Sequence, residues 1–438
     1  MRSFWPTGGL WRQHDFLKLW SAETISDFGS QVGQLAMPLV AILVLDATAF
    51  EVAALGVVLF LPFILFTLPA GVWVDRLPRR PILIVGDFGR AALLATVPIA
   101  YFADALTLAQ LFVVAFLVGA LQVFFDVAYQ SYLPSIVERE QIIDGNSKLE
   151  ISRSAAQVGG PGLGGVLVQV FTAPYAVLLD AFSFVGSGLF LLFIRKTEEP
   201  PAVADADGQK PSLWTDLKEG LHFVLGNPNL RAQAGCTATS NFFGNVAFAT
   251  LLVFAVRELG LSAGAIGIIF SLGAAGSLAA ALTATRISAR FGIGPTSIVV
   301  AALYGPTILL VALAPAGNAA IPVLIVSQLL FGFTIVVYNI VQVSYRQAIC
   351  PPRLQGRMNS VMRFMVWGTI PFGGLLGGAL ATWIGLRETI VVGAVGGGLA
   401  FLWLLLSPQR HLREMPEPIG DDVASETARA EALPSLSA

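Results

Sequence analysis

Residues 157–167 read QVGGPGLGGVL, with five glycines and one proline among eleven residues. In water this composition predicts a loop, because glycine and proline both weaken the interior of a helix. Apolar sequence nevertheless continues on both sides, from Ala155 to Val170. A lipid environment reconciles the two observations, since helices in a bilayer approach each other closely through small residues.

The composition of the whole chain indicates a membrane protein. Of its 438 residues, 55% are hydrophobic and only 12% are charged, and the mean hydropathy is +0.74. Soluble domains carry about 25% charged residues, so this much apolar surface requires lipid as its solvent. The net charge of −2 argues against nucleic acid as a partner. Cys236 and Cys350 lack the spacing of metal ligands and are expected to be free thiols.

Apolar runs recur along the chain at a length that suits a bilayer, which a helix of about 20 residues can cross. The pattern predicts twelve spanning helices, at residues 17–45, 51–74, 81–103, 107–133, 147–172, 174–194, 232–256, 263–286, 295–314, 320–348, 357–384 and 387–407. Polar sequence separates the sixth helix from the seventh and follows the twelfth. We therefore expect an N-terminal six-helix bundle (1–195), a cytoplasmic linker (196–230), a C-terminal six-helix bundle (231–408) and a disordered cytoplasmic tail (409–438).

The basic residues indicate how the chain is oriented in the membrane. With the N-terminus inside, all but three of the 26 Lys and Arg residues fall on the cytoplasmic side. The exceptions are Arg90 within a span and Arg257 and Arg387 at outer helix ends. This asymmetry follows the positive-inside rule. We expect a multi-pass protein of the bacterial plasma (inner) membrane with both termini in the cytoplasm.

An internal repeat relates the two halves, because residues 111–167 align with residues 324–380 without a gap. The polar matches carry this interpretation and include Ser131 with Ser344, Tyr132 with Tyr345, Asn146 with Asn359 and Ser147 with Ser360. The glycine matches are Gly160 with Gly373, Gly164 with Gly377 and Gly165 with Gly378. Chance similarity between two glycine-rich helices is the alternative. The repeat predicts two parallel-related six-helix bundles, each with a glycine-rich packing face.

The loop between the second and third predicted helices reads GVWVDRLPRR at residues 71–80. It resembles the signature loop of the major facilitator superfamily, G-x-x-x-D-R-x-G-R-R/K. The matching residues are Gly71, Asp75, Arg76, Arg79 and Arg80, whereas Pro78 stands where the superfamily has glycine. The resemblance implies an all-α fold of twelve transmembrane helices, a cytoplasmic gate at this loop, and a chain that functions as a monomer.

The opening stretch resembles the motif that marks antiporters in this superfamily, g-x-x-x-G-P-x-x-G-G. Gly160, Pro161, Gly164 and Gly165 match it, and Ala156 replaces the first small residue. Helix one carries FLKLWSAETISDFGSQV, helix six carries LLDAFSF, and helix four has no arginine. In these features the chain is similar to the macrolide-efflux and enterobactin-exporter branch of drug:proton antiporters.

Polar side chains form stripes at helical spacing along four predicted helices. The resemblance implies that these helices, the first, fourth, seventh and tenth, line the substrate cavity. The cavity candidates are Glu23, Gln31, Gln34, Gln122, Tyr129, Gln130, Asn241, Asn245, Asn339 and Gln342. For the amides, the alternative is that they only hydrogen-bond the helices to one another.

Ionisable residues within the predicted spans are costly to bury and are therefore candidates for function. Asp27, Asp126 and Asp180 are the proton-coupling candidates, although Asp180 could instead make a bond between helices. Asp87 and Arg90 lie three residues apart on one helix and are predicted to form a structural ion pair. Arg90 could instead reach Asp27.

Several motifs are missing from the sequence. All three histidines lie outside the predicted spans, and nothing matches the phosphate-binding pattern G-x-x-x-x-G-K-[ST]. We therefore expect no metal, no cofactor and no use of ATP by this chain. No nucleophile–base arrangement can be recognised, which argues against an enzyme.

These observations favour a proton-coupled secondary active exporter that moves a bulky organic compound, such as a drug, macrolide or siderophore, by alternating access. Its partners would be the substrate, protons and the lipid bilayer. An importer or facilitator of a small nutrient on the same fold is the alternative, and a non-transporting receptor or lipid-handling enzyme is a more distant one. The antiporter-type motif weighs against import.

Overall fold

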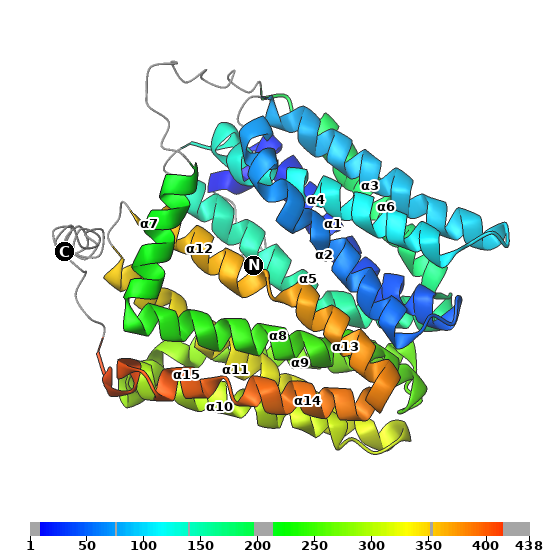
Figure 1. Ribbon diagram of the computed structural model, residues 1–438. Coiled ribbons are helices and arrows are strands. Elements are labelled where there is room, and N and C mark those ends of the chain that lie inside the picture. Colours follow the sequence, from blue (N-terminus) through cyan, green and yellow to red (C-terminus); the bar gives the residue numbers. More distant parts are fainter. Residues whose placement is uncertain (1–8, 75–76, 139–140, 197–212, 351–353, 415–438) are drawn as a thin grey trace, which may run out of the picture. The chain divides into compact units, whose positions relative to one another are not determined.

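The computed structural model describes residues 9–74, 77–138, 141–196, 213–350 and 354–414, and within these ranges it is helical with no strand (Figure 1). The first helices are α1 (His14–Leu43), α2 (Ala49–Val74), α3 (Arg79–Phe102), α4 (Leu108–Ile136), α5 (Ile142–Val170) and α6 (Ala173–Leu192). The others are α7 (Leu213–Gly226), α8 (Pro228–Arg257), α9 (Ala263–Phe291), α10 (Ile293–Ala312), α11 (Ala320–Ile349), α12 (Gln355–Trp367), α13 (Ile370–Ile384), α14 (Leu386–Gly398) and α15 (Phe401–Leu405). The all-α fold class predicted from the sequence is confirmed.

Among the described residues, ten helical segments are long and apolar enough to cross a membrane, and each falls on one of the predicted spans. The two remaining predicted spans, 17–45 and 147–172, fall on α1 and α5. These helices have 30 and 29 residues, which is enough to cross a bilayer, but they carry more polar side chains. Helices α1 and α5 therefore differ from the ten apolar segments in polarity and not in length.

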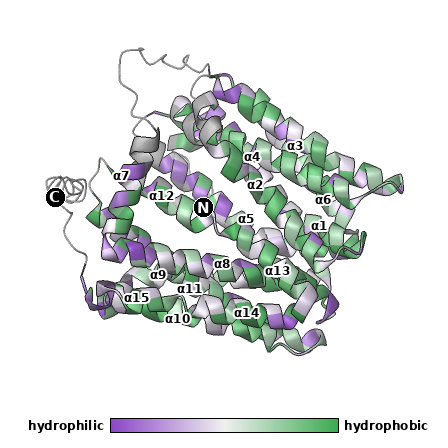
Figure 2. Ribbon diagram, viewed as in Figure 1, coloured by the Kyte–Doolittle hydropathy of each residue, from purple (hydrophilic) through white to green (hydrophobic). Residues whose placement is uncertain are grey.

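Apolar side chains cover much of the helix surface. Trp383 and Leu406 have exposed fractions of 83% and 79%. Figure 2 shows hydrophobic residues along the helices, while hydrophilic residues gather at helix ends, for example at the start of α3, and in α7. Large apolar patches are unusual on soluble monomers, so this surface is suited to lipid.

Two predicted spans are interrupted in the structure. The span 357–384 is divided into α12 and α13 around Gly368, and the span 387–407 is divided into α14 and α15. Helix α7, which packs against α12, lies in the segment expected to be a linker and was not anticipated from the sequence. Pro161 stays inside α5, as is common in membrane helices.

The chain divides into two compact units. The first unit, Met1–Asp205 with Leu252–Leu272, contains α1 to α6, in which α1 packs on α5 and α6, and α3 packs on α4 and α6. The second unit, Ala206–Leu251 with Gly273–Ala438, contains α7 and α10 to α15, in which α10 packs on α11 and α14. Helices α8 and α9 contribute to both units.

Candidate functional site

Arg90 is the centre of a charge cluster inside the first unit. Its side chain lies on α3 with an exposed fraction of 1%, and its Nη2 is 2.5 Å from Oδ1 of Asp87, which is fully buried. The guanidinium carbon lies 4.3 Å from the ring centroid of Phe125 on α4 and 4.1 Å from that of Phe184 on α6. Two aromatic faces and one carboxylate therefore hold the cation in place away from water.

A hydrogen-bonded chain leads from Arg90 to Asp126 on α4. Nη1 of Arg90 donates to Oε1 of Gln122, and Nε2 of Gln122 donates to Oδ1 of Asp126 at 2.7 Å. Gln122 and Asp126 are one helical turn apart, so one amide can contact both neighbours. The amide thus links the Asp87–Arg90 ion pair to a second carboxyl that is only partly buried.

The acids of α1 belong to the same electrostatic cluster. Glu23 has an exposed fraction of 5%, and its Oε1 has no hydrogen-bond partner among the described residues. The charges of Asp27, Asp87, Arg90 and Asp126 all act on Glu23. A buried carboxylate oxygen without a hydrogen-bond partner is costly, so burial favours the neutral form of Glu23 over the charged one.

Asp27 is less buried than Glu23 and interacts with a residue that the sequence analysis did not select. The charge of Arg153, on α5, attracts Asp27, and the charge of Asp126 repels it. Arg153 lies near the start of a glycine-rich span, where the positive-inside rule already accounts for a basic residue. The carboxyls of Glu23, Asp27, Asp87 and Asp126, together with that of Glu150, thus outnumber Arg90 and Arg153.

Asp180 occupies a different place, between α1 and α6. Its carboxyl lies against Gly29 and Gly33 of α1, where a Cβ on Gly33 would come within 2.0 Å of Oδ2. Oγ of Ser183 donates to the carbonyl of Asp180 at 2.7 Å. The carboxyl interacts electrostatically with Arg90. It also fills the space that Gly29 and Gly33 leave between the helices.

The other cavity candidates of the first unit are spread along α1 and α4. The Gln31 side chain packs against Gly160 of α5, and Gln34 is exposed. Tyr129 stacks on Phe125 with 6.3 Å between the ring centroids. Gln130 is on α4, but its side chain lies outside the described part of the structure.

The candidates of the second unit are uncharged, and two of the four bond to backbone. Asn241 donates to the carbonyl of Val366 at 3.1 Å, and Asn245 donates to that of Asn241 at 2.8 Å. Asn339 is exposed, whereas Gln342 is buried with neither amide atom hydrogen-bonded among the described residues. Every buried charged residue in the described chain belongs to the first unit.

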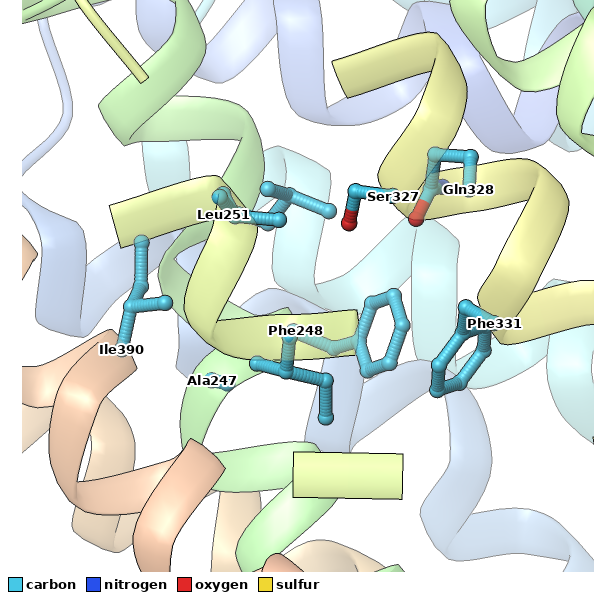
Figure 3. Close-up of a pocket in the computed structure, with 9 residues that line it drawn as sticks. Ala247, Phe248, Leu251, Ser327, Gln328, Phe331 and Ile390 are labelled. Carbon is cyan, nitrogen blue, oxygen red and sulfur yellow. The ribbon is translucent and has the colours of Figure 1, made fainter. Parts of the chain in front are cut away.

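A small cavity in the second unit is almost wholly apolar (Figure 3). Its lining is Ala247, Phe248, Leu251, Ile308, Val311, Ser327, Gln328, Phe331 and Ile390. The Phe248 and Phe331 rings are 4.9 Å apart between centroids, and Ser327 Oγ already donates to the carbonyl of Thr307 at 2.6 Å. With no charged lining residue among those described, the cavity offers nothing that could carry a proton.

The signature loop is only partly described. Gly71 is in the last turns of α2, and Asp75 and Arg76 lie outside the described residues. Arg79 and Arg80 begin α3. Nε and Nη2 of Arg80 donate to the carbonyls of Leu191 and Leu192 at 3.2 and 2.7 Å, so this cation caps the C-terminal end of α6.

The glycines of α5 bring its backbone close to two other helices of the first unit. A Cβ on Gly164 would lie 3.2 Å from Cα of Val32 in α1. A Cβ on Gly165 would lie 2.5 Å from the carbonyl oxygen of Ala263 in α9, and the N–H of Gly162 donates to Oγ of Ser271 at 2.8 Å. The helix therefore has no room for side chains on two of its faces.

Replacement of Gly164 by valine is expected to separate α5 from α1 and to destabilise the protein by about 1–3 kcal/mol, the usual cost of overpacking. Thermal unfolding in detergent would measure the loss. Gly56→Val on α2 is the matched control, because a Cβ on Gly56 meets nothing within 4 Å. Equal melting temperatures for the two variants would contradict a packing role for Gly164.

Comparisons with known proteins show what the chain is similar to. Residues 8–427 match the model of a family described as transmembrane secretion effector. The multidrug efflux pump Tap of Mycolicibacterium fortuitum is 27% identical over 362 residues, which cover 79% of this chain and 84% of that protein. A bacterial homologue of the iron transporter ferroportin, solved in an inward-facing state, covers 91% of this chain and 100% of its own, with a TM-score of 0.69 and 19% identity. The nucleoside transporter NupG covers 90% and 98%, with a TM-score of 0.67 and 15% identity, and both structural likenesses concern the fold alone.

Proposed function

Because the chain belongs to the transmembrane secretion effector family of the major facilitator superfamily, whose members are membrane transporters and not enzymes, we propose that it exports a bulky organic compound in exchange for protons. The observation that carries this proposal is the hydrogen-bonded chain from Asp87 through Arg90 and Gln122 to Asp126. Ionisable groups at membrane depth are expensive and are usually kept for transport.

Asp126 is the proposed proton carrier. In the structure it accepts a hydrogen bond from Gln122, and Asp27 is close enough for the two charges to repel. Two neighbouring carboxyls favour a shared proton, because both cannot easily be charged at once. A substrate cation that enters this cluster neutralises the repulsion between the two carboxylates, so that both can be charged and the shared proton leaves. By thermodynamic linkage, binding of a proton in turn weakens the binding of the cation.

The charge balance of the cluster favours a substrate that carries a positive charge. The carboxyls of the cluster outnumber its two arginines, and the Phe125 and Tyr129 rings stack beside them. Aromatic faces and carboxylates together bind lipophilic cations. Ethidium, a planar lipophilic cation, is therefore a suitable probe.

Export is proposed over import on two grounds. The α5 motif resembles that of antiporters, and the relative Tap is named a multidrug efflux pump. We further propose that both termini are cytoplasmic in the inner membrane of a bacterium, that the monomer is active, that no ATP is used, and that the chain works by alternating access.

Uptake of ethidium into inverted membrane vesicles tests the proposal. An inside-acid pH gradient is expected to drive accumulation, and nigericin, which collapses the gradient, is expected to abolish it. A pH-sensitive dye trapped in the vesicles should report alkalinisation when ethidium is added. Accumulation that needs ATP or that ignores the gradient would contradict proton exchange, and accumulation only with the reversed gradient would favour the importer.

A further inference from the structure

A groove of about 610 Å³ lies on the second unit, between the first half of α8 and the end of the chain's last span. Its lining includes Arg231, Thr239, Leu399, Leu402, Trp403, Leu406 and Pro408. None of these residues belongs to the charge cluster of the first unit. The groove therefore needs its own explanation.

The groove runs past the interruption between α14 and α15. Helix α14 ends at Gly398 and α15 begins at Phe401, and the groove is lined by residues on both sides of this interruption. The Trp403 indole crosses to α8, where its Nε1 donates to Oγ1 of Thr239 at 3.1 Å. Gly235 admits this ring, since a Cβ there would come within 2.7 Å of it.

The walls of the groove are apolar and open outward. Leu399, Trp403 and Leu406 have exposed fractions of 53%, 50% and 79%. The hydrocarbon region of a bilayer contains no water, so exposed apolar side chains in that region contact acyl chains. We therefore expect an acyl chain to occupy the groove.

One end of the groove is cationic. Arg231 is exposed, donates to the carbonyl of Leu225 at 3.3 Å, and pairs with no carboxylate among the described residues. Arg410, two residues beyond the lining residue Pro408, donates from Nε to Nε2 of His411 at 2.9 Å and pairs with no carboxylate among the described residues. In the orientation proposed above, the start of α8 and the end of α15 both lie at the cytoplasmic surface.

We propose that this groove binds an anionic phospholipid of the cytoplasmic leaflet. One acyl chain lies along Leu399, Leu402 and Trp403, and the phosphate lies on Arg231. The apolar walls of the groove favour a lipid as the ligand. Arg231 and Arg410, which pair with no carboxylate among the described residues, favour a lipid with an anionic headgroup. The proposal concerns residues of the second unit, none of which belongs to the charge cluster, and it depends on the proposed function only through the orientation of the chain.

Native mass spectrometry of the detergent-solubilised protein tests this site with two added lipids, phosphatidylglycerol and phosphatidylethanolamine. The wild type is expected to retain phosphatidylglycerol preferentially, and Arg231→Gln is expected to weaken that retention about fivefold, the contribution of one basic residue near a lipid phosphate. Arg231→Lys should keep most of the preference. Arg290→Gln is the matched control, since Arg290 is an exposed arginine near the end of α9 in the same unit but outside the groove.

A second variant tests the acyl part independently. Leu402→Trp narrows the groove and is expected to reduce retention of both lipids, whereas Arg231→Gln reduces retention of the anionic lipid alone. Equal losses in Arg231→Gln and Arg290→Gln, or no preference for phosphatidylglycerol in the wild type, would overturn the proposal. Displacement of the lipid adduct by ethidium would also overturn it, because the groove would then belong to the substrate path. Ethidium transport by the wild type in vesicles is a separate readout, so failure of this site is distinguishable from failure of the proposed export.

Discussion

Asp126→Asn is expected to abolish ethidium accumulation driven by a pH gradient while leaving exchange of ethidium down its own gradient. Asparagine keeps the shape of the side chain and still accepts the hydrogen bond from Gln122, but it cannot take up or release a proton. The loss of gradient-driven accumulation should be at least about tenfold, within the usual range of coupling between two ligands. Proteoliposomes with and without an imposed pH gradient would measure the two activities side by side.

Asp104→Asn is the matched control for this experiment. Asp104 is exposed after α3, in a left-handed backbone conformation with φ of 50° that asparagine also adopts readily. Its replacement should leave both activities unchanged. Full gradient-driven accumulation by Asp126→Asn would remove Asp126 from the mechanism and leave Asp27, Glu23 or Asp180 to carry the proton.

Arg90→Leu is expected to have the largest effect on stability. It removes the cation between Phe125 and Phe184 and leaves the fully buried Asp87 carboxylate without its partner. Breaking a buried ion pair from one side costs about 3–5 kcal/mol, so we expect a steep fall in both membrane expression and melting temperature.

A double variant separates the structural role of Arg90 from its role in transport. Asp87→Asn with Arg90→Gln removes both charges together and should recover much of the stability that Arg90→Leu loses. It should not recover proton-driven transport, because the cation that organises Gln122 and Asp126 is gone. A double variant no more stable than Arg90→Leu would show that the ion pair is not the reason for the loss.

The sequence predicted the fold well because its evidence was local. Each feature used for the prediction can be recognised within one continuous stretch of sequence. These features are the apolar runs of membrane length, the glycines of residues 157–167 and the signature loop. The break at Gly368 and the helix α7 were missed for a physical reason. An interruption within an apolar run does not alter the hydropathy that marks a span, and a short amphipathic helix beside the run does not alter it either.

The candidate site was predictable only in part. The three-residue spacing of Asp87 and Arg90 is a local feature, and the structure places the two side chains in contact. The bond from Arg90 to Gln122 joins residues on different helices, and no spacing along one helix reveals it. Arg153 was overlooked because a basic residue near a helix end has an ordinary explanation in the positive-inside rule.

The most direct test of proton exchange is the release of protons when substrate binds. Purified protein in weakly buffered detergent solution would be mixed with ethidium while a pH indicator records the protons released. The wild type is expected to release protons on binding, and Asp126→Asn is expected to bind ethidium with little or no release. Equal proton release by the two proteins at equal ethidium occupancy would contradict the assignment of the exchanged proton to Asp126.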